Sequence, residues 1–221
     1  MDAILGNNTV NGQNTGLAVG LLSSNTGEPE ANTFQAVFND IEITATGDVP
    51  NVLYRVNAGG PEIAAIDGGI VWSADTSTNN SPFLSNPGSN NTAGFSAVEP
   101  GATVPVTTPG AIFDTERWDN PSAPEMQWAF DVPDPGVYEV RLYLGNGFNG
   151  TDDPGERVFD VAIEGEVLSN LDNVDLSAQF GHQVGGVITN NVTVTDGTLD
   201  IEFLHLVENP LINGIEILQG A

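Results

Sequence analysis

Residues 53–75 read LYRVNAGGPEIAAIDGGIVWSAD and decide the fold of this chain. From residue 53 to 57 the side chains alternate between two faces, which is the period of two of a half-buried strand. Gly59 and Gly60 end the strand, and their missing side chains let another backbone or a ligand come close. A tight turn explains the two glycines equally well. A second short strand, carrying Trp72, closes the stretch.

Short runs of alternating apolar and polar residues continue to the end of the chain. They cover residues 126–131, 138–144, 159–163, 167–171, 192–195, 199–203 and 212–218. Asp196-Gly197 between two of these runs predicts a hairpin with a type I′ turn. Residues 76–109, rich in Asn, Ser, Thr, Pro and Gly, predict a long irregular loop. Repeated short strands without a helical period predict an all-β fold, an antiparallel two-sheet β-sandwich.

The first 46 residues differ from the rest. Residues 17–22 and 34–44 are strand-like runs joined by a polar segment, and together they predict a β-hairpin. Because two strands alone are marginal in water, this hairpin needs a surface to lean on. It resembles the closing hairpin of a concanavalin-like lectin or glucanase jelly roll, which suggests a preceding, truncated domain, a linker at 47–51 and a main domain at 52–221. Alternatively, the hairpin is an extra edge of the main sandwich.

The charge is strongly one-sided: 30 acidic residues face four basic ones, and the formal net charge is −26. Such a surface repels itself in dilute buffer, and molar salt, with a Debye length of ~3 Å, removes most of that penalty. We therefore expect a halophilic archaeon or bacterium as the source. The same charge argues against nucleic acid and acidic membranes as partners.

Sequence features bearing on location are few. The chain has no cysteine, which excludes disulfides and thiolate chemistry. Its first residues have neither the basic region nor the apolar run of a secretion signal, and no apolar run is long enough to insert into a membrane. If the protein is exported, its signal lies outside this sequence.

Several sequence blocks, in this order, carry a family resemblance. They are LYRVNAGG and GGIVWSAD, IFDTERW, WAFDVPDPGVYEVRLYL, ERVFDVAIEGEVLSNLD, VTVTDGTLDIEF and ENPLINGIEIL. Together they resemble a malectin domain over about residues 52–219. The resemblance implies a jelly-roll-like sandwich whose loops at one end bind a sugar, a glucose-containing oligosaccharide in the best-known members.

The resemblance also implies the sugar-binding residues. The first aromatic of the family falls on Trp72, and a second, in the following variable loop, corresponds to Phe95. The adjacent aromatic pair of the family falls on Phe148 and Asn149, so one ring is replaced by an amide. The aspartate that precedes an Asn-Pro in the family falls on Glu208.

Physical chemistry favours the same residue types. The C–H face of a pyranose packs on an aromatic plane, and its hydroxyl groups need directed hydrogen bonds, for which carboxylates form the stronger, charge-assisted kind. Trp72 and Phe148 are expected to pack their aromatic faces on the sugar, and Glu208 and Asn149 are expected to hydrogen-bond the hydroxyl groups at its edge. Trp72 lies in an apolar run, however, and a core position explains it as well.

Other constellations favour structural roles. Asp114, Glu116 and Asp119 lie around Arg117, and paired carboxylates can hydrolyse glycosides, but an arginine–carboxylate structural pair is the simpler interpretation. We expect no catalytic residues and no enzyme.

Metal-binding motifs are equally sparse. His182 and His205 are too far apart in sequence to form a metal motif. Asp152 and Asp153 could hold a structural calcium ion, although solvation of a loop is the simpler explanation. We otherwise expect no cofactor.

Three functions remain open. The first is a non-catalytic carbohydrate-binding module, linked covalently to neighbouring domains of a larger secreted or cell-surface protein and bound to an oligosaccharide or polysaccharide. The second is an adhesive or structural interaction domain that does not bind sugar. The third is a glycoside hydrolase.

Overall fold

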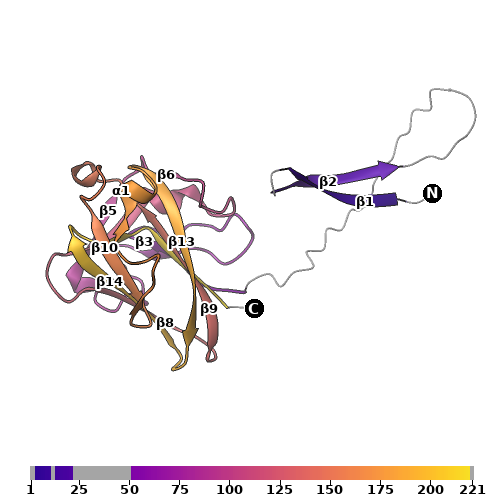
Figure 1. Cartoon of the computed structure of the whole chain (residues 1–221). Helices are drawn as coiled ribbons and strands as arrows, with labels where there is room; N and C mark the ends of the chain where they lie inside the picture. The colour runs from indigo at the N-terminus through magenta and orange to yellow at the C-terminus, as the bar shows by residue number, and fades with distance from the viewer. Residues whose placement is uncertain (1–2, 11–12, 22–50, 220–221) are drawn as a thin grey trace, which may run out of the picture. The chain divides into compact units, whose positions relative to one another are not determined.

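The computed structural model describes residues 3–10, 13–21 and 51–219, and the chain divides into two compact units, 1–45 and 46–221 (Figure 1). In the first unit, β1 (Ala3–Val10) pairs with β2 (Gln13–Leu21) in an antiparallel ladder. The predicted strand at 17–22 is thus present up to Leu21. Its described partner is β1, which the sequence did not predict, and the expected partner at 34–44 lies outside the described residues. The division into a truncated domain and a linker stays a prediction.

The second unit is built on two sheets that face each other (Figure 1). One has the order β4-β3-β16-β9-β13-β6, with bounds Ser73–Asp75, Asn51–Ala58, Gly214–Gln219, Gly136–Gly145, Val184–Val194 and Glu99–Pro100. The other has the order β11-β10-β14-β8, with β12 also on β10; the bounds are Glu166–Val167, Val158–Ile163, Thr198–Val207, Met126–Asp131 and, for β12, Val174–Asp175.

A smaller sheet and short helices complete the unit. The small sheet has the order β15-β7-β5, with bounds Leu211–Ile212, Thr115–Asp119 and Asn90–Gly94. The helices are η1 (Pro87–Ser89), η2 (Gly110–Asp114), η3 (Asn149–Thr151) and α1 (Leu176–Gln179). Among the described residues, none of the helices has the length and apolar character needed to cross a bilayer.

The core lies between the two large sheets. Alternate residues of β8, namely Met126, Trp128 and Phe130, are buried against alternate residues of β9 such as Val140 and Leu142. This interdigitation is the reason for the period of two in the sequence, because every second side chain of each strand must leave water. The predicted all-β sandwich is confirmed. Most strand pairs are antiparallel, and β3–β4 and β13–β6 are parallel.

One turn prediction is wrong. The Asp196-Gly197 turn does not close a hairpin, because β13 and β14 on either side of it belong to different sheets. Gly197 has a positive φ of 92°, and Asp196 does not have the positive φ of a type I′ turn. A two-residue hairpin joins β10 to β11, where Glu164 (φ 54°) and Gly165 (φ 74°) supply both positive φ angles. In a sandwich, a short turn can carry the chain from one sheet to the other as readily as back along the same sheet.

The outer face of the larger sheet carries a second apolar cluster. Residues of the long segment between β3 and β7, among them Trp72, Ile112 and Phe113, pack on Tyr143 of β9. Its start is set by Gly59, where a Cβ atom would lie 2.1 Å from the carbonyl oxygen of Glu116. The close approach expected of the double glycine is therefore made by the backbone of β7.

A buried ion pair fastens this segment to β7. Arg117 is bidentate to Asp75, with Nε–Oδ2 at 2.5 Å and Nη2–Oδ1 at 2.8 Å, and both side chains are almost completely buried. The guanidinium also donates to the side-chain oxygens of Asn90 and Asn80. Asp75 in turn accepts from the backbone N–H of Gly59 and of Ser81. One arginine thus holds both ends of the segment 75–90 in register with β7.

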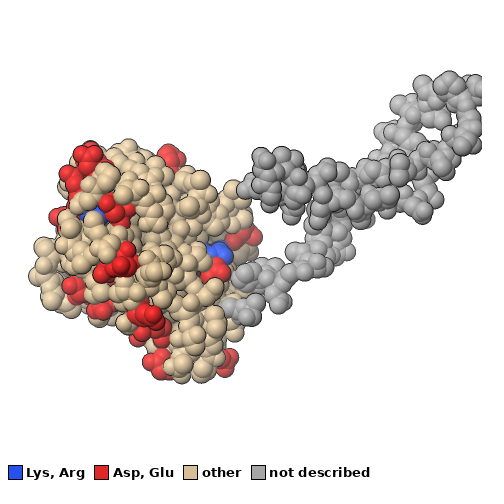
Figure 2. Space-filling model, viewed as in Figure 1, with Lys and Arg blue, Asp and Glu red and all other residues tan. Residues whose placement is uncertain are grey.

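The visible surface of this unit is acidic. Figure 2 shows Asp and Glu side chains scattered over the visible face, with little basic surface between them. This distribution follows from the composition and from the burial of arginine side chains such as Arg117.

We predict that Arg117→Met lowers the free energy of unfolding by about 3–5 kcal/mol, because it leaves the Asp75 carboxylate buried without a counter-charge. Urea denaturation in molar salt measures the change. The double variant with Asp75→Asn should recover part of the loss. As a control, Glu139→Gln removes one partner of the partly exposed Arg141 and should cost about 1 kcal/mol or less. A single-variant loss as small as that of the control would contradict the assignment.

Candidate functional site

A pocket of about 270 Å³ lies where the small sheet meets loops that follow β5, β9 and β14. Its lining residues are Ala93, Phe95, Glu116, Trp118, Phe148, Arg157, Glu208 and Asn209. Three of the five residues predicted for the ligand site, Phe95, Phe148 and Glu208, are brought together here.

Two phenylalanine rings form one wall of the pocket. Phe95 directly follows β5, and Phe148 directly precedes η3; their ring centroids lie 6.5 Å apart at an interplanar angle of 56°. Gly147 makes this approach possible, because a Cβ atom there would lie 2.3 Å from the Cβ atom of Phe95. The Phe148 side chain remains 45% exposed. A large ring that stays in solvent beside a pocket offers a ligand an apolar face.

Strand β7 supplies the floor. Glu116 and Trp118 share one face of the strand, and Arg117 between them points to the opposite face, toward Asp75. Glu116 is only 2% exposed, and burial raises its pKa to about 7, although the charge of Arg157 lowers it. Near neutral pH this carboxyl group can therefore either donate or accept a hydrogen bond.

Arg157 precedes β10 and is 5% exposed. Burial lowers its pKa, and the nearby charges of Glu116 and Glu208 act in the opposite direction. Within the described part of the chain, Nε and Nη1 of Arg157 and Oε2 of Glu116 have no hydrogen-bond partner. Buried polar groups are nearly always hydrogen-bonded, so these atoms are suited to a ligand that carries both donors and acceptors.

The opposite rim consists of Glu208 and Asn209, which follow β14. Glu208 has a positive φ of 59°, which turns the chain sharply after the strand. The Asn209 amide donates to the Glu208 carboxylate over 2.8 Å and so orients it. The carboxylate remains exposed and able to accept from a ligand hydroxyl group.

The predicted residue Asn149 lies on the far side of the phenylalanine pair. A second, more open pocket of about 370 Å³ shares Phe95 and Phe148 with the first and adds Asn149 and Gln183. The Asn149 side-chain oxygen lies 3.1 Å from Nε2 of His182. The two pockets therefore adjoin each other along the phenylalanine pair.

Trp72 does not belong to this site. Its side chain is 1% exposed, in edge contact with Tyr143 at 5.2 Å between ring centroids, and the Arg55 guanidinium lies 5.4 Å from the centre of its ring. The structure corrects the prediction that Trp72 contacts a sugar. The ring is covered within the apolar cluster on the outer face of the larger sheet. The alternative of a core position is the one the structure adopts.

The acidic residues that the sequence also singled out lie in separate parts of the structure. Asp114, Glu116 and Asp119 do not gather around Arg117, whose ionic partner is Asp75. Asp152 and Asp153 lie exposed in the loop after η3, and calcium at that loop stays a prediction. Arg157, Trp118 and the pocket-facing role of Glu116 were not predicted from the sequence. The alternation of TERWD at 115–119 indicates that Glu116 and Trp118 share one face of a strand. No comparable sequence pattern indicates that Arg157 lines the pocket.

Comparison with known proteins gives the family. A sequence model of the Malectin domain matches residues 52–215, most of the chain. The chain belongs to the malectin domain family. This places the domain among binding modules rather than enzymes, and its fold is the predicted all-β sandwich. No curated protein matches the chain.

Solved structures of plant receptor kinases share the fold of this malectin domain. The plant receptor-like kinase FER matches with a TM-score of 0.66 and 19% identity over 76% of this chain and 49% of that chain. The ANX1 ectodomain from Arabidopsis thaliana matches with a TM-score of 0.65 and 18% identity over 76% and 48%. A complex of the plant peptide RALF23 with FER and LLG2 matches with a TM-score of 0.63 and 19% identity over the same shares. The chain spans about half the length of these structures.

We predict that Glu116 makes stability depend on pH. The usual pKa of 4.5 applies to the unfolded chain and about 7 to the folded one, so between these values the folded state holds a proton that the unfolded state has released. Stability is therefore lost as the pH rises through this window, by roughly 3 kcal/mol, and levels off above it.

The measurement compares wild type with Glu116→Gln by urea denaturation from pH 5 to 8. The wild type should lose stability relative to the variant across this range, and Glu99→Gln, an exposed acid on β6, reports the background. A constant difference between wild type and Glu116→Gln would show that the carboxyl group stays in one protonation state.

Proposed function

We propose that this malectin domain is a non-catalytic carbohydrate-binding module that holds the end of a glucose-type saccharide in the pocket between Phe148 and Glu208. The observation that carries the proposal is the combination, in one pocket, of an exposed aromatic ring with the unpartnered buried groups of Glu116 and Arg157. A sugar ring matches it, because one molecule offers a C–H face and hydroxyl groups that both donate and accept.

The pocket dimensions support a terminal residue as the bound unit. Its volume of about 270 Å³ lies near the lower end for small-molecule pockets, which start at roughly 300 Å³. The adjoining pocket at Asn149 and Gln183 leaves room for the next residue of the saccharide. In this arrangement Phe148 packs under the first ring, Glu208 and Glu116 bind hydroxyl groups, and Arg157 donates to a ring or hydroxyl oxygen.

A peptide is the second candidate ligand. One structural neighbour is a complex of FER with the peptide RALF23 and LLG2. In the present chain, the unpartnered Arg157 guanidinium would suit a carboxylate of such a peptide. This function corresponds to the adhesive or protein-interaction domain expected from the sequence.

The setting we propose is the outside of a cell in a saline environment. The neighbouring structures are ectodomains about twice as long as the matched part, in line with a module covalently linked to other domains. The net charge of −26 supports operation in high salt, where surface repulsion is screened.

We predict that Phe148→Ala weakens saccharide binding about tenfold or more, because burial of a phenylalanine side chain contributes ~1.5–3 kcal/mol. Glu208→Gln should also weaken it about tenfold through loss of a charge-assisted hydrogen bond. Glycan-array screening in molar salt, followed by calorimetric titration of the best glucose-containing ligand, measures both.

The matched control is Trp72→Phe, which changes a buried aromatic ring outside the pocket and should leave the affinity of the folded protein unchanged. Binding that survives Phe148→Ala and is lost in Trp72→Phe would contradict the proposed pocket. Absence of any glycan ligand together with binding of an acidic peptide would favour the second candidate. Release of reducing sugar would contradict both.

A further inference from the structure

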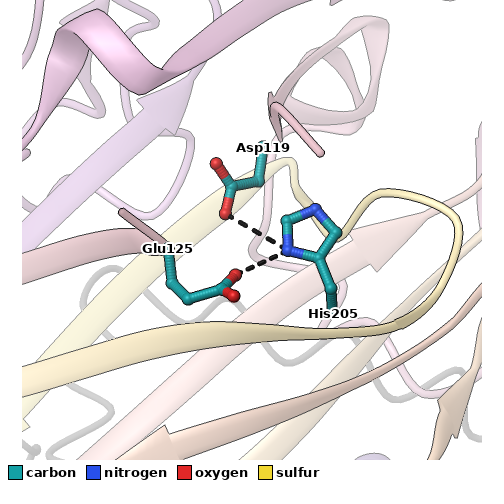
Figure 3. A group of neighbouring side chains, drawn as sticks. All are labelled: Asp119, Glu125 and His205. Atoms are coloured by element: carbon teal, nitrogen blue, oxygen red, sulfur yellow. Dashed lines mark hydrogen bonds and ion pairs between the residues drawn. The ribbon is translucent and has the colours of Figure 1, made fainter. Parts of the chain in front are cut away.

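Three potential metal ligands from three separate segments meet outside the proposed saccharide pocket (Figure 3). They are Asp119 at the end of β7, Glu125 just before β8, and His205 on β14, and one ligand atom from each lies within 4.8 Å of the other two. Nδ1 of His205 is 2.5 Å from Oε2 of Glu125 and 3.8 Å from Oδ2 of Asp119. None of the three residues lines the pocket at Phe148.

The buried member of this group lacks a compensating charge. Asp119 is fully buried, and its carboxylate points toward His205 in Figure 3. Oδ2 accepts from the backbone N–H of Met126, while Oδ1 has no partner within the described part of the chain. The described ion pairs connect Asp119 to no arginine, only to the His205 ring.

We propose that Asp119, Glu125 and His205 form a binding site for a divalent transition-metal cation of the zinc type. One imidazole nitrogen and two carboxylate oxygens are a ligand set of borderline softness, which zinc accepts with a water molecule in the fourth position. Calcium is a poorer match, because it takes six to eight oxygen ligands. The cation supplies the positive charge that the buried Asp119 lacks.

The geometry needs only a small adjustment. Tetrahedral zinc with bonds near 2.0–2.2 Å places its ligand atoms about 3.3 Å apart. The present separations of 2.5 and 3.8 Å lie on either side of that value. The Glu125 side chain is 31% exposed and follows the loop after β7, so it can withdraw from the imidazole. In the metal-bound form the cation takes the place of the present contact between Nδ1 of His205 and Oε2 of Glu125.

Such a site connects elements of two sheets. Asp119 ends a strand of the small sheet, and His205 lies in β14 of the five-stranded sheet. A bound cation therefore joins the two sheets a short distance along the chain from Trp118 and Glu208 of the pocket. Anything that binds the folded state alone stabilises it, so the cation should raise the melting temperature.

Zinc titration of the whole chain tests the proposal, after removal of metals with a chelator. Calorimetry in molar sodium chloride with excess magnesium suppresses diffuse binding to the acidic surface. Because the chain contains two histidines, nitrogen-15 spectra of the imidazole rings identify which ring binds. We expect one zinc ion per chain, a shift of the His205 ring signals and a higher melting temperature.

Variants separate the site from non-specific binding. His205→Gln should weaken zinc binding at least a hundredfold and Glu125→Gln at least tenfold, and the partly exposed Glu125 makes its variant the one expected to fold normally. His182→Gln removes the other histidine, which contacts Asn149, and should bind zinc like the wild type.

The proposal is overturned by any of three results: no zinc binding above the level seen with magnesium, equal binding in His205→Gln, or a shift of the His182 ring alone. Saccharide titrations of the same variants test the proposed function separately from the zinc site, since the three metal ligands lie outside the pocket.

Discussion

The buried pair between Arg117 and Asp75 is the interaction on which the rest of the site depends. It fastens the segment covering the outer face of the larger sheet to β7, and it fixes the rotation of β7 about its own axis. Because side chains alternate along a strand, fixing Arg117 on one face sets Glu116 and Trp118 on the other. The same strand ends at Asp119, in the proposed cation site. One ion pair thus positions a pocket floor on the opposite side of the strand.

Local pattern predicted a large part of this fold, and non-local contacts decided the remainder. Alternation located β8, β9 and β14, since burial on one face leaves that trace in the sequence. The turn at Asp196-Gly197 was misread because the alternation does not tell which sheet a strand joins. Trp72 was misplaced as a ligand contact because the sandwich has an additional apolar layer, formed by a segment with little periodic structure. Val106, an apolar residue of that segment, is 95% exposed.

Pocket residues could be predicted from the sequence where the residue type and its neighbours indicate an exposed position. Phe148 stands between glycine and asparagine in a polar loop, and a family resemblance added Phe95 and Glu208. Arg157 could not be found this way, because its meeting with Glu116 depends on how β7, in the small sheet, faces the start of β10 in another sheet. The sequence interval between the two residues carries no signal of that contact.

The ion pairs of the four arginine side chains differ, and the difference shows that stability alone does not explain the pocket. Arg55, Arg117 and Arg141 each meet carboxylates at 2.5–3.0 Å, so the few positive charges of this acidic chain are largely used in ion pairs. Arg157 is buried to the same degree as Arg55, yet within the described residues it forms no ion pair, and two of its nitrogen atoms lack partners. Burying a guanidinium this way costs free energy, and an acidic chain offers many carboxylates that could have relieved the cost. A local cost that the rest of the structure does not recover is typical of a binding site. The unpaired arginine is therefore the strongest structural argument that the pocket is kept open for a ligand.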